Sequence, residues 1–249
     1  MVRQPAGISP ALDIGFHDDS FAHSTVGDVG WFFVPRLEAA GAARRWLDVA
    51  IGGELRPELQ PQVFAADWEP AIEEYGQDFS ECVAATHASW LVNYHAFNGA
   101  GGAGYVGEDL ERARAGALAM GWEIRVVDVH AAGRDRGDGT AALTLRVGVR
   151  NTGVAPFYYP LDLVVTAQCC GVEARAAIDG LPPTDPLDAP VELALALDGL
   201  PATALDDSAF TLALASPMRL PGQRMSFANA EVDADGRLGL PAPVAPPPP

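Results

Sequence analysis

In the first half of the chain, a short apolar run ends in polar residues three times. The runs cover 12–16, 49–53 and 89–97, and their polar tips read HDD, GGELRPE and NYHAFN. Each run is followed by a helical pattern, over 31–47, 78–88 and 107–121. Asp78 is the predicted cap of the second helix, with Glu81 three residues on. Parallel strands joined through helices bring their ends to one edge of a sheet. We therefore expect the three tips to share an edge, as active-site residues do in a (β/α) barrel.

The number of such units limits the fold. A closed barrel has eight strands in about 250 residues, whereas residues 1–121 hold three strand–helix units. We therefore predict a partial (β/α)-barrel domain over 1–121, made of the last three units of a larger barrel. A partial barrel exposes apolar edges, so we also expect self-association or a complementing chain.

From residue 122 the hydrophobic period changes to two. Seven short strands follow, separated by turn signals such as Asp138-Gly139, and they cover 122–130, 141–150, 162–169, 172–178, 191–198, 209–215 and 223–231. This spacing is typical of an antiparallel sandwich. The predicted fold class is therefore α/β plus all-β, with an immunoglobulin-like β-sandwich over 122–240. Residues 241–249 form a Pro-rich tail that we expect to be disordered.

Composition excludes several classes of partner. The chain has 33 acidic and 16 basic residues, a net charge of −17, which disfavours binding to nucleic acid or an anionic membrane surface. No apolar run approaches the roughly 20 residues of a spanning helix, and the first residues, MVRQPAGISPA, lack the apolar core of a signal peptide. The three cysteines have no metal-ligand or disulfide spacing, so we expect ordinary buried thiols.

Glu54 is the central candidate for chemistry. It follows two glycines that allow a close approach of another backbone or a ligand, and Arg56 beside it would lower its pKa by Coulombic attraction. The other acids on a strand tip are Asp18 and Asp19. Side chains predicted to bind substrate at the same rim are His17, Asp18, Asp19, Arg56, Glu58, Asn93, Tyr94, His95 and Asn98. Trp31, Trp90 or Tyr94 would offer a stacking surface. The alternative is that Glu54, Arg56 and Glu58 form a structural ion-pair cluster that braces the loop.

Two further hypotheses, a dinucleotide-binding loop and a metal site, have less support in the sequence than the site around Glu54. Residues 99–104, GAGGAG, match the dinucleotide-binding pattern, with Asp128 at the end of the next strand. The preceding strand is polar, however, and 105–107 separate the glycines from the helix, so a flexible loop explains them as well. A metal site would use His17, Asp18, His87 and His95, but His87 lies in a predicted helix away from the rim. We predict no cofactor and no metal.

Four segments, HDDSFAHSTVGDVGWFF, IGGELRPELQ, THASWLVNYHAFN and MGW…NTGVAPFYYP, together resemble the bacterial proteins classed as domain of unknown function 4832. The resemblance runs in order over 12–220. It implies a glycosidase-like TIM barrel followed by a β-sandwich. If 12–16, 49–53 and 90–96 are strands six to eight of such a barrel, Glu54 falls on the position of a glutamate nucleophile. The acid/base of such enzymes comes from the fourth strand, which has no counterpart here.

Two classes of function follow. One is a glycoside-hydrolase-like protein that acts on or binds carbohydrate, as a truncated form of a larger barrel enzyme. Hydrolysis needs two carboxyl groups about 5–5.5 Å or 6.5–9.5 Å apart, and the usual partner of Glu54 is missing. The other class is therefore a non-catalytic module that binds carbohydrate or protein.

Overall fold

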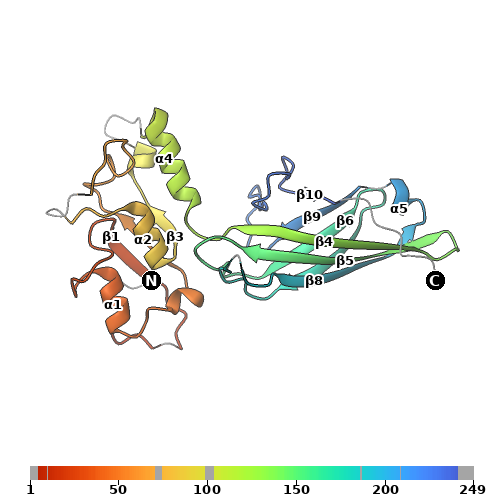
Figure 1. The fold of residues 1–249 in the computed structure, drawn as a ribbon, viewed down its shortest axis with the longest axis horizontal. Helices are drawn as coiled ribbons and strands as arrows, with labels where there is room; N and C mark the ends of the chain where they lie inside the picture. The colour runs from red at the N-terminus through yellow and green to blue at the C-terminus, as the bar shows by residue number, and fades with distance from the viewer. Residues whose placement is uncertain are drawn as a thin grey trace. The chain divides into compact units, whose positions relative to one another are not determined.

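The computed structural model describes residues 5–9, 11–70, 75–98, 104–185, 187–207 and 209–240. The chain divides into two compact units (Figure 1). The first comprises 1–122 together with 153–158, and the second comprises 123–152 and 159–249. The short segment 153–158 therefore belongs to the first unit, although its neighbours in sequence belong to the second.

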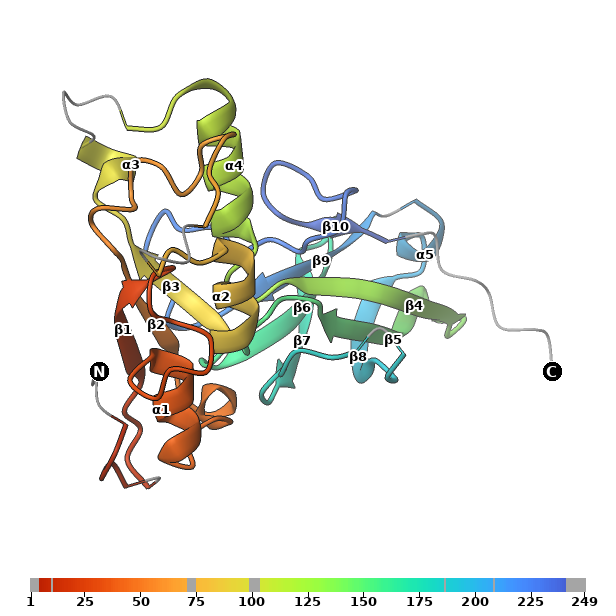
Figure 2. The ribbon, with the colours of Figure 1, turned by 60° about the vertical axis from the view of Figure 1, so that its left-hand side comes forward.

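The first unit is built on a parallel sheet with strand order β1-β2-β3 (Figure 2). The strands are β1 (Phe16–Phe21), β2 (Ile51–Leu55) and β3 (Ala88–Val92). The helices are α1 (Phe33–Ala39), the 3-10 helix η1 (Arg45–Leu47), α2 (Phe79–Thr86), α3 (His95–Asn98) and α4 (Gly107–Leu118). Because both strand pairs are parallel, the C-terminal ends of the three strands lie at the same edge of the sheet, as expected for such units.

The predicted fold class, a partial (β/α) barrel followed by an immunoglobulin-like sandwich, is wrong. Within the described residues no barrel closes, the parallel sheet has three strands, and most of the regular structure belongs to three small sheets. The pattern of alternating strands and helices is the same in a piece of a barrel and in a small open sheet, because closure depends on contacts far apart in sequence.

Local boundaries also differ from the predictions. The first strand begins at Phe16 rather than ending there, so the HDD tip lies inside β1. The predicted helix over 31–47 stops at Ala39, and Gly41 follows in the left-handed region with a φ of 66°. A shorter 3-10 helix then completes the segment.

The second unit contains two antiparallel sheets (Figure 1). One has the order β4-β5-β8, formed by β4 (Ile124–Asp135), β5 (Thr140–Asn151) and β8 (Val191–Pro201). The other has the order β10-β9-β6-β7, formed by β6 (Leu161–Ala167), β7 (Val172–Ile178), β9 (Phe210–Ala215) and β10 (Leu238–Gly239). A short helix, α5 (Ala204–Asp207), follows β8. Residues 223–231, predicted as a strand, form none, and the tail 241–249 lies outside the described residues.

In the part of the chain that the structure describes, no helix combines the length and apolar character required to span a bilayer.

Helices α1 and α2 cover the same face of the parallel sheet. Phe33 and Leu37 of α1 are buried with the strand residues Phe16 and Ile51. Buried side chains of α2 pack with those of all three strands, in a cluster that includes Phe79, Cys82, Val83, Phe21, Leu55 and Ala88. Each strand therefore directs alternate side chains toward the helices, and the intervening side chains point to the opposite face.

The glycine pair at the centre of β2 is explained by close packing. A Cβ on Gly52 would lie 2.3 Å from the Trp90 indole, and a Cβ on Gly53 would lie 2.0 Å from the backbone oxygen of Asp18. Gly52 pairs with His17 and Trp90, and Gly53 with Asp18. The glycines thus allow the three strands to pack closely. The sequence suggested that a backbone or a ligand could approach these glycines, and the structure shows that neighbouring strands do so.

We expect the substitution Gly53→Ala to destabilise the chain by about 3 kcal/mol, because the new methyl group would overlap a backbone atom that cannot move alone. Gly30→Ala is the matched control, since its Cβ would meet nothing within 4 Å and we expect a change below about 0.5 kcal/mol. Urea denaturation of both variants measures the difference. Equal stability of the two variants would contradict the packing argument.

Candidate functional site

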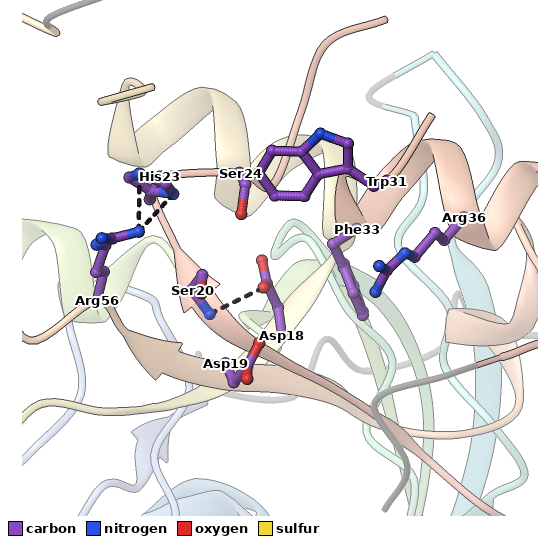
Figure 3. Close-up of a pocket in the computed structure, with 9 residues that line it drawn as sticks. All are labelled: Asp18, Asp19, Ser20, His23, Ser24, Trp31, Phe33, Arg36 and Arg56. Carbon is purple, nitrogen blue, oxygen red and sulfur yellow. Dashed lines mark hydrogen bonds between the residues drawn. The ribbon is translucent and has the colours of Figure 1, made fainter. Parts of the chain in front are cut away.

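A pocket opens beside the C-terminal end of β1 (Figure 3). Its volume is about 100 Å³, and its lining residues are Asp18, Asp19, Ser20, His23, Ser24, Trp31, Phe33, Arg36 and Arg56. The indole of Trp31, which is 48% exposed, lies across the pocket from Asp18 in Figure 3. The pocket therefore combines carboxylates, hydroxyls and guanidinium groups with one large aromatic surface.

Asp18 anchors the base of this pocket. It is 3% exposed, and its carboxylate accepts hydrogen bonds from the Thr25 hydroxyl at 2.7 Å and from the Ser20 N–H at 3.1 Å. Burial raises the pKa of Asp18, and the bonds from Thr25 and Ser20 oppose that rise. Thr25 Oγ1 in turn accepts from the Ala22 N–H at 3.1 Å. One buried carboxylate thus fixes the loop that follows β1.

Gln77 holds the same loop from the other side. Its Oε1 accepts from the N–H groups of Thr25 and Val26 at 2.8 and 3.0 Å, and its Nε2 donates to the Val26 oxygen at 2.6 Å. Sequence reasoning missed Gln77. The only nearby signal was the predicted cap at Asp78, which is confirmed because Asp78 accepts from the Glu81 N–H at 2.9 Å.

Arg56 was predicted to lie against Glu54, but its contacts in the structure are with other residues. Its Nε donates to Glu58 at 3.0 Å, and its Nη1 lies 2.8 Å from His23 Nε2. A hydrogen bond within Glu58 to its own backbone lowers the pKa of that carboxylate, as does the charge of Arg56. Among the described residues, the pair Arg56–Glu58 therefore matches part of the alternative, an ion-pair cluster that braces the loop, but Glu54 does not join it. His23 is a further contact that the sequence did not predict.

Glu54 lies at the same sheet edge but outside the lining of the pocket. It pairs with Val92 of β3 and is half-buried. It follows Gly53, whose missing side chain would point toward Asp18, so alternation places Glu54 on the opposite face of the sheet.

That opposite face carries other predicted residues. The rings of His17 and Trp90 lie 5.5 Å apart, and Gly52 between them leaves the space for this contact. Asp19 points away from Asp18 in Figure 3, and it is also among the residues that line the pocket. The predicted site residues of β1 and β2 are therefore divided between two faces.

The tip of β3 is held by internal bonds. Asn93 Nδ2 donates to the Tyr105 hydroxyl at 3.1 Å, and that hydroxyl donates to the backbone oxygen of Gln60. The His95 N–H donates to Gln60 Oε1 at 3.1 Å, and burial raises the pKa of Tyr105. Tyr94, by contrast, is 64% exposed. Asn93 and His95 thus hold the local structure and are not brought to the pocket.

Two further hypotheses concern a dinucleotide loop and a metal site. Asn98 ends α3, and its side chain lies outside the described part of the chain, as do residues 99–103 of the proposed dinucleotide loop. The metal hypothesis also required His87. In the described ranges, no group of three or more His, Cys, Asp or Glu side chains is placed to hold a metal ion.

His87 has a structural role instead. Its ring stacks on Trp46 with centroids 3.5 Å apart, and its Nδ1 donates to the Val154 oxygen at 2.6 Å. Burial lowers the pKa of His87. The Tyr158 hydroxyl donates to the Trp46 oxygen at 2.6 Å. These contacts attach the segment 153–158 to the first unit.

Comparison with known proteins identifies no relative: no family model matches the chain, and no curated protein and no solved structure matches it significantly. The resemblance to domain of unknown function 4832 therefore stays a prediction.

The raised pKa of Asp18 leads to a test by pH. A carboxyl whose pKa is higher in the folded state contributes stability that is present below the unfolded pKa and is lost as pH rises through the folded pKa. We expect the free energy of unfolding of the wild type, relative to Asp18→Asn, to increase as pH falls from about 7 to about 4. Urea denaturation at several pH values measures this difference.

Asp138→Asn is the control of opposite sign. Hydrogen bonds from Thr140 lower the pKa of the exposed Asp138, so its contribution is present above the unfolded pKa and is lost as pH falls through the folded pKa. If the Asp18→Asn difference did not change with pH, or followed the direction of Asp138→Asn, the assignment of Asp18 as a destabilised buried carboxylate would be wrong.

Proposed function

We propose that this chain is a glycoside-hydrolase-like protein that binds carbohydrate, with its site at the pocket beside the end of β1. The observation that supports this most is the exposed Trp31 indole above buried and half-buried polar groups. A sugar ring presents an apolar face and a rim of hydroxyls, so it needs an aromatic surface and hydrogen-bonding groups together. Binding pockets combine apolar walls with a few placed polar groups in this way.

Arg36 supplies a donor for such a ligand. Its guanidinium lines the pocket, and among the described residues no hydrogen bond or ion pair engages it. Arginine presents five N–H donors in a fixed plane, and bonds from a charged donor are stronger than neutral ones. Ser20, Ser24 and Asp18 offer further hydroxyl and carboxylate oxygens. Ligand hydroxyls would therefore meet both donors and acceptors.

The size of the pocket indicates that it encloses only part of a ligand. Its volume of about 100 Å³ is smaller than the roughly 300–1,000 Å³ of pockets that enclose a drug-sized ligand. We infer that the hydroxyl-bearing edge of a sugar enters the pocket while the rest of the ring lies on Trp31. This arrangement suits the end or the side of an oligosaccharide.

Binding is favoured over hydrolysis because Glu54 does not line the pocket and Arg56 is paired with Glu58. Hydrolysis remains a second candidate for one reason. Asp19 and Glu54 lie on neighbouring strands, each directly after the pair Asp18–Gly53, and the register of the two strands shifts between Asp18 and Phe21. Neighbouring strands are about 4.8 Å apart, close to the roughly 5–5.5 Å between the carboxyl groups of retaining glycosidases.

We expect Trp31→Ala to weaken oligosaccharide binding by about tenfold, which corresponds to about 1.4 kcal/mol, because the ligand loses its aromatic contact. Titration calorimetry with a panel of neutral oligosaccharides measures the affinity. Tyr94→Ala is the control, since Tyr94 is more exposed than Trp31 and does not line the pocket. An equal loss in both variants, or no binding of any oligosaccharide by the wild type, would overturn the proposal.

Aryl glycosides separate binding from hydrolysis. We expect neither the wild type nor Glu54→Gln to release the aryl group, because Glu54 lies outside the pocket. Absorbance of the released phenol reports the reaction. Release by the wild type that is lost in both Glu54→Gln and Asp19→Asn would establish the hydrolytic candidate instead.

A further inference from the structure

Two adjacent cysteines occupy the turn between β6 and β7. Both Cys169 and Cys170 are exposed, and their Sγ atoms lie 2.9 Å apart. A disulfide bond is about 2.05 Å long, so these are two thiols in contact. The expectation of buried thiols is correct for Cys82 and wrong for this pair, because the turn places both side chains in solvent.

The turn that carries the pair is held at both ends. The Gly171 N–H donates to the Ala167 oxygen at 2.9 Å, with Gly171 in the left-handed region at a φ of 67°. Gln168 donates from its backbone N–H to Ala209 at 3.0 Å and from its Nε2 to the Thr211 hydroxyl at 2.9 Å. These bonds attach the turn to β9 as well as to its own hairpin. The two thiols therefore sit on a fixed support.

We propose that Cys169 and Cys170 form a redox-active dithiol that closes to an intramolecular disulfide by exchange with a small-molecule disulfide such as glutathione disulfide. The proposal rests on the contact between the two sulfurs and on their exposure. The contact allows the second thiol to attack as soon as the first has reacted, and exposure admits the co-reactant. It is independent of the carbohydrate site.

The exchange takes place in two displacements. The thiolate of one cysteine attacks a sulfur of glutathione disulfide, forming a mixed disulfide and releasing one glutathione thiolate. The thiolate of the other cysteine then attacks the protein sulfur of that mixed disulfide, which forms the Cys169–Cys170 bond and releases the second glutathione. The two protons lost by the cysteines end on the two glutathione thiols, so the protein is oxidised and glutathione disulfide is reduced.

The product should be easy to reduce again. Consecutive Cα atoms are about 3.8 Å apart across a trans peptide, below the roughly 4.4–6.8 Å that disulfides usually span. A strained, exposed disulfide has a more oxidising potential and is labile. We therefore assign the pair as a reversible modification site and not as a structural crosslink.

Cys82 provides an internal reference. The chain has three cysteines, and burial raises the pKa of Cys82 to about 12. Because the thiolate is the nucleophile, Cys82 should stay reduced in the folded protein. Any thiol lost on treatment then belongs to the exposed pair.

The test treats the reduced full chain with glutathione disulfide and follows intact mass and thiol number after denaturation. We expect the wild type to lose the mass of two hydrogen atoms, to keep one titratable thiol and to regain the other two with dithiothreitol. Cys169→Ser and Cys170→Ser should each gain one glutathione instead, because no second thiol is present to displace it. Circular dichroism checks that both variants are folded.

Several results would overturn the proposal. A wild type that carries two glutathiones, or forms disulfide-linked dimers, would show that the two sulfurs do not react with each other. A wild type that keeps three thiols while the serine variants take up glutathione would show that closure does not occur. A wild type and variants that all stay fully reduced would show that the pair does not react with this class of oxidant.

Discussion

The close approach of three parallel strands at Gly52 and Gly53 determines the rest of the first unit. A side chain at either position would overlap Trp90 or the backbone of Asp18, so only glycine allows β2 to lie between its neighbours in this way. The resulting register directs Asp18 toward the helices and His17 and Glu54 away from them. The division of the polar residues between two faces follows from this packing.

The pocket is built by the loop after β1 more than by the tip of β2. Burying the Asp18 carboxylate is unfavourable, and its hydrogen bonds to Thr25 and Ser20 offset part of that cost. The same bonds, together with those of Gln77, fix the path of the chain as it leaves β1. Trp31 and Arg36, which come next in the sequence, complete the lining.

Local patterns predicted the features that depend on neighbouring residues. The strand at Ile51, the Asp78 cap and the common edge of the three strand ends follow from periodicity and from parallel connections. The prediction of a partial barrel was wrong because barrel formation depends on contacts between residues far apart in the sequence. The polar start of β1 concealed that strand from the sequence pattern. The sequence allowed an ion pair of Arg56 with either Glu54 or Glu58, and nothing in it indicates that Gln77 bonds to Val26.

The proposed carbohydrate site lies at the pocket beside the end of β1. An NMR titration of the labelled chain with the oligosaccharide that binds most tightly tests it most directly, because each backbone amide and each indole N–H reports separately. We expect the indole signal of Trp31 and the amide signals of 18–24 to shift together and to saturate at one concentration. Shifts confined to other tryptophans or to the second unit would contradict it.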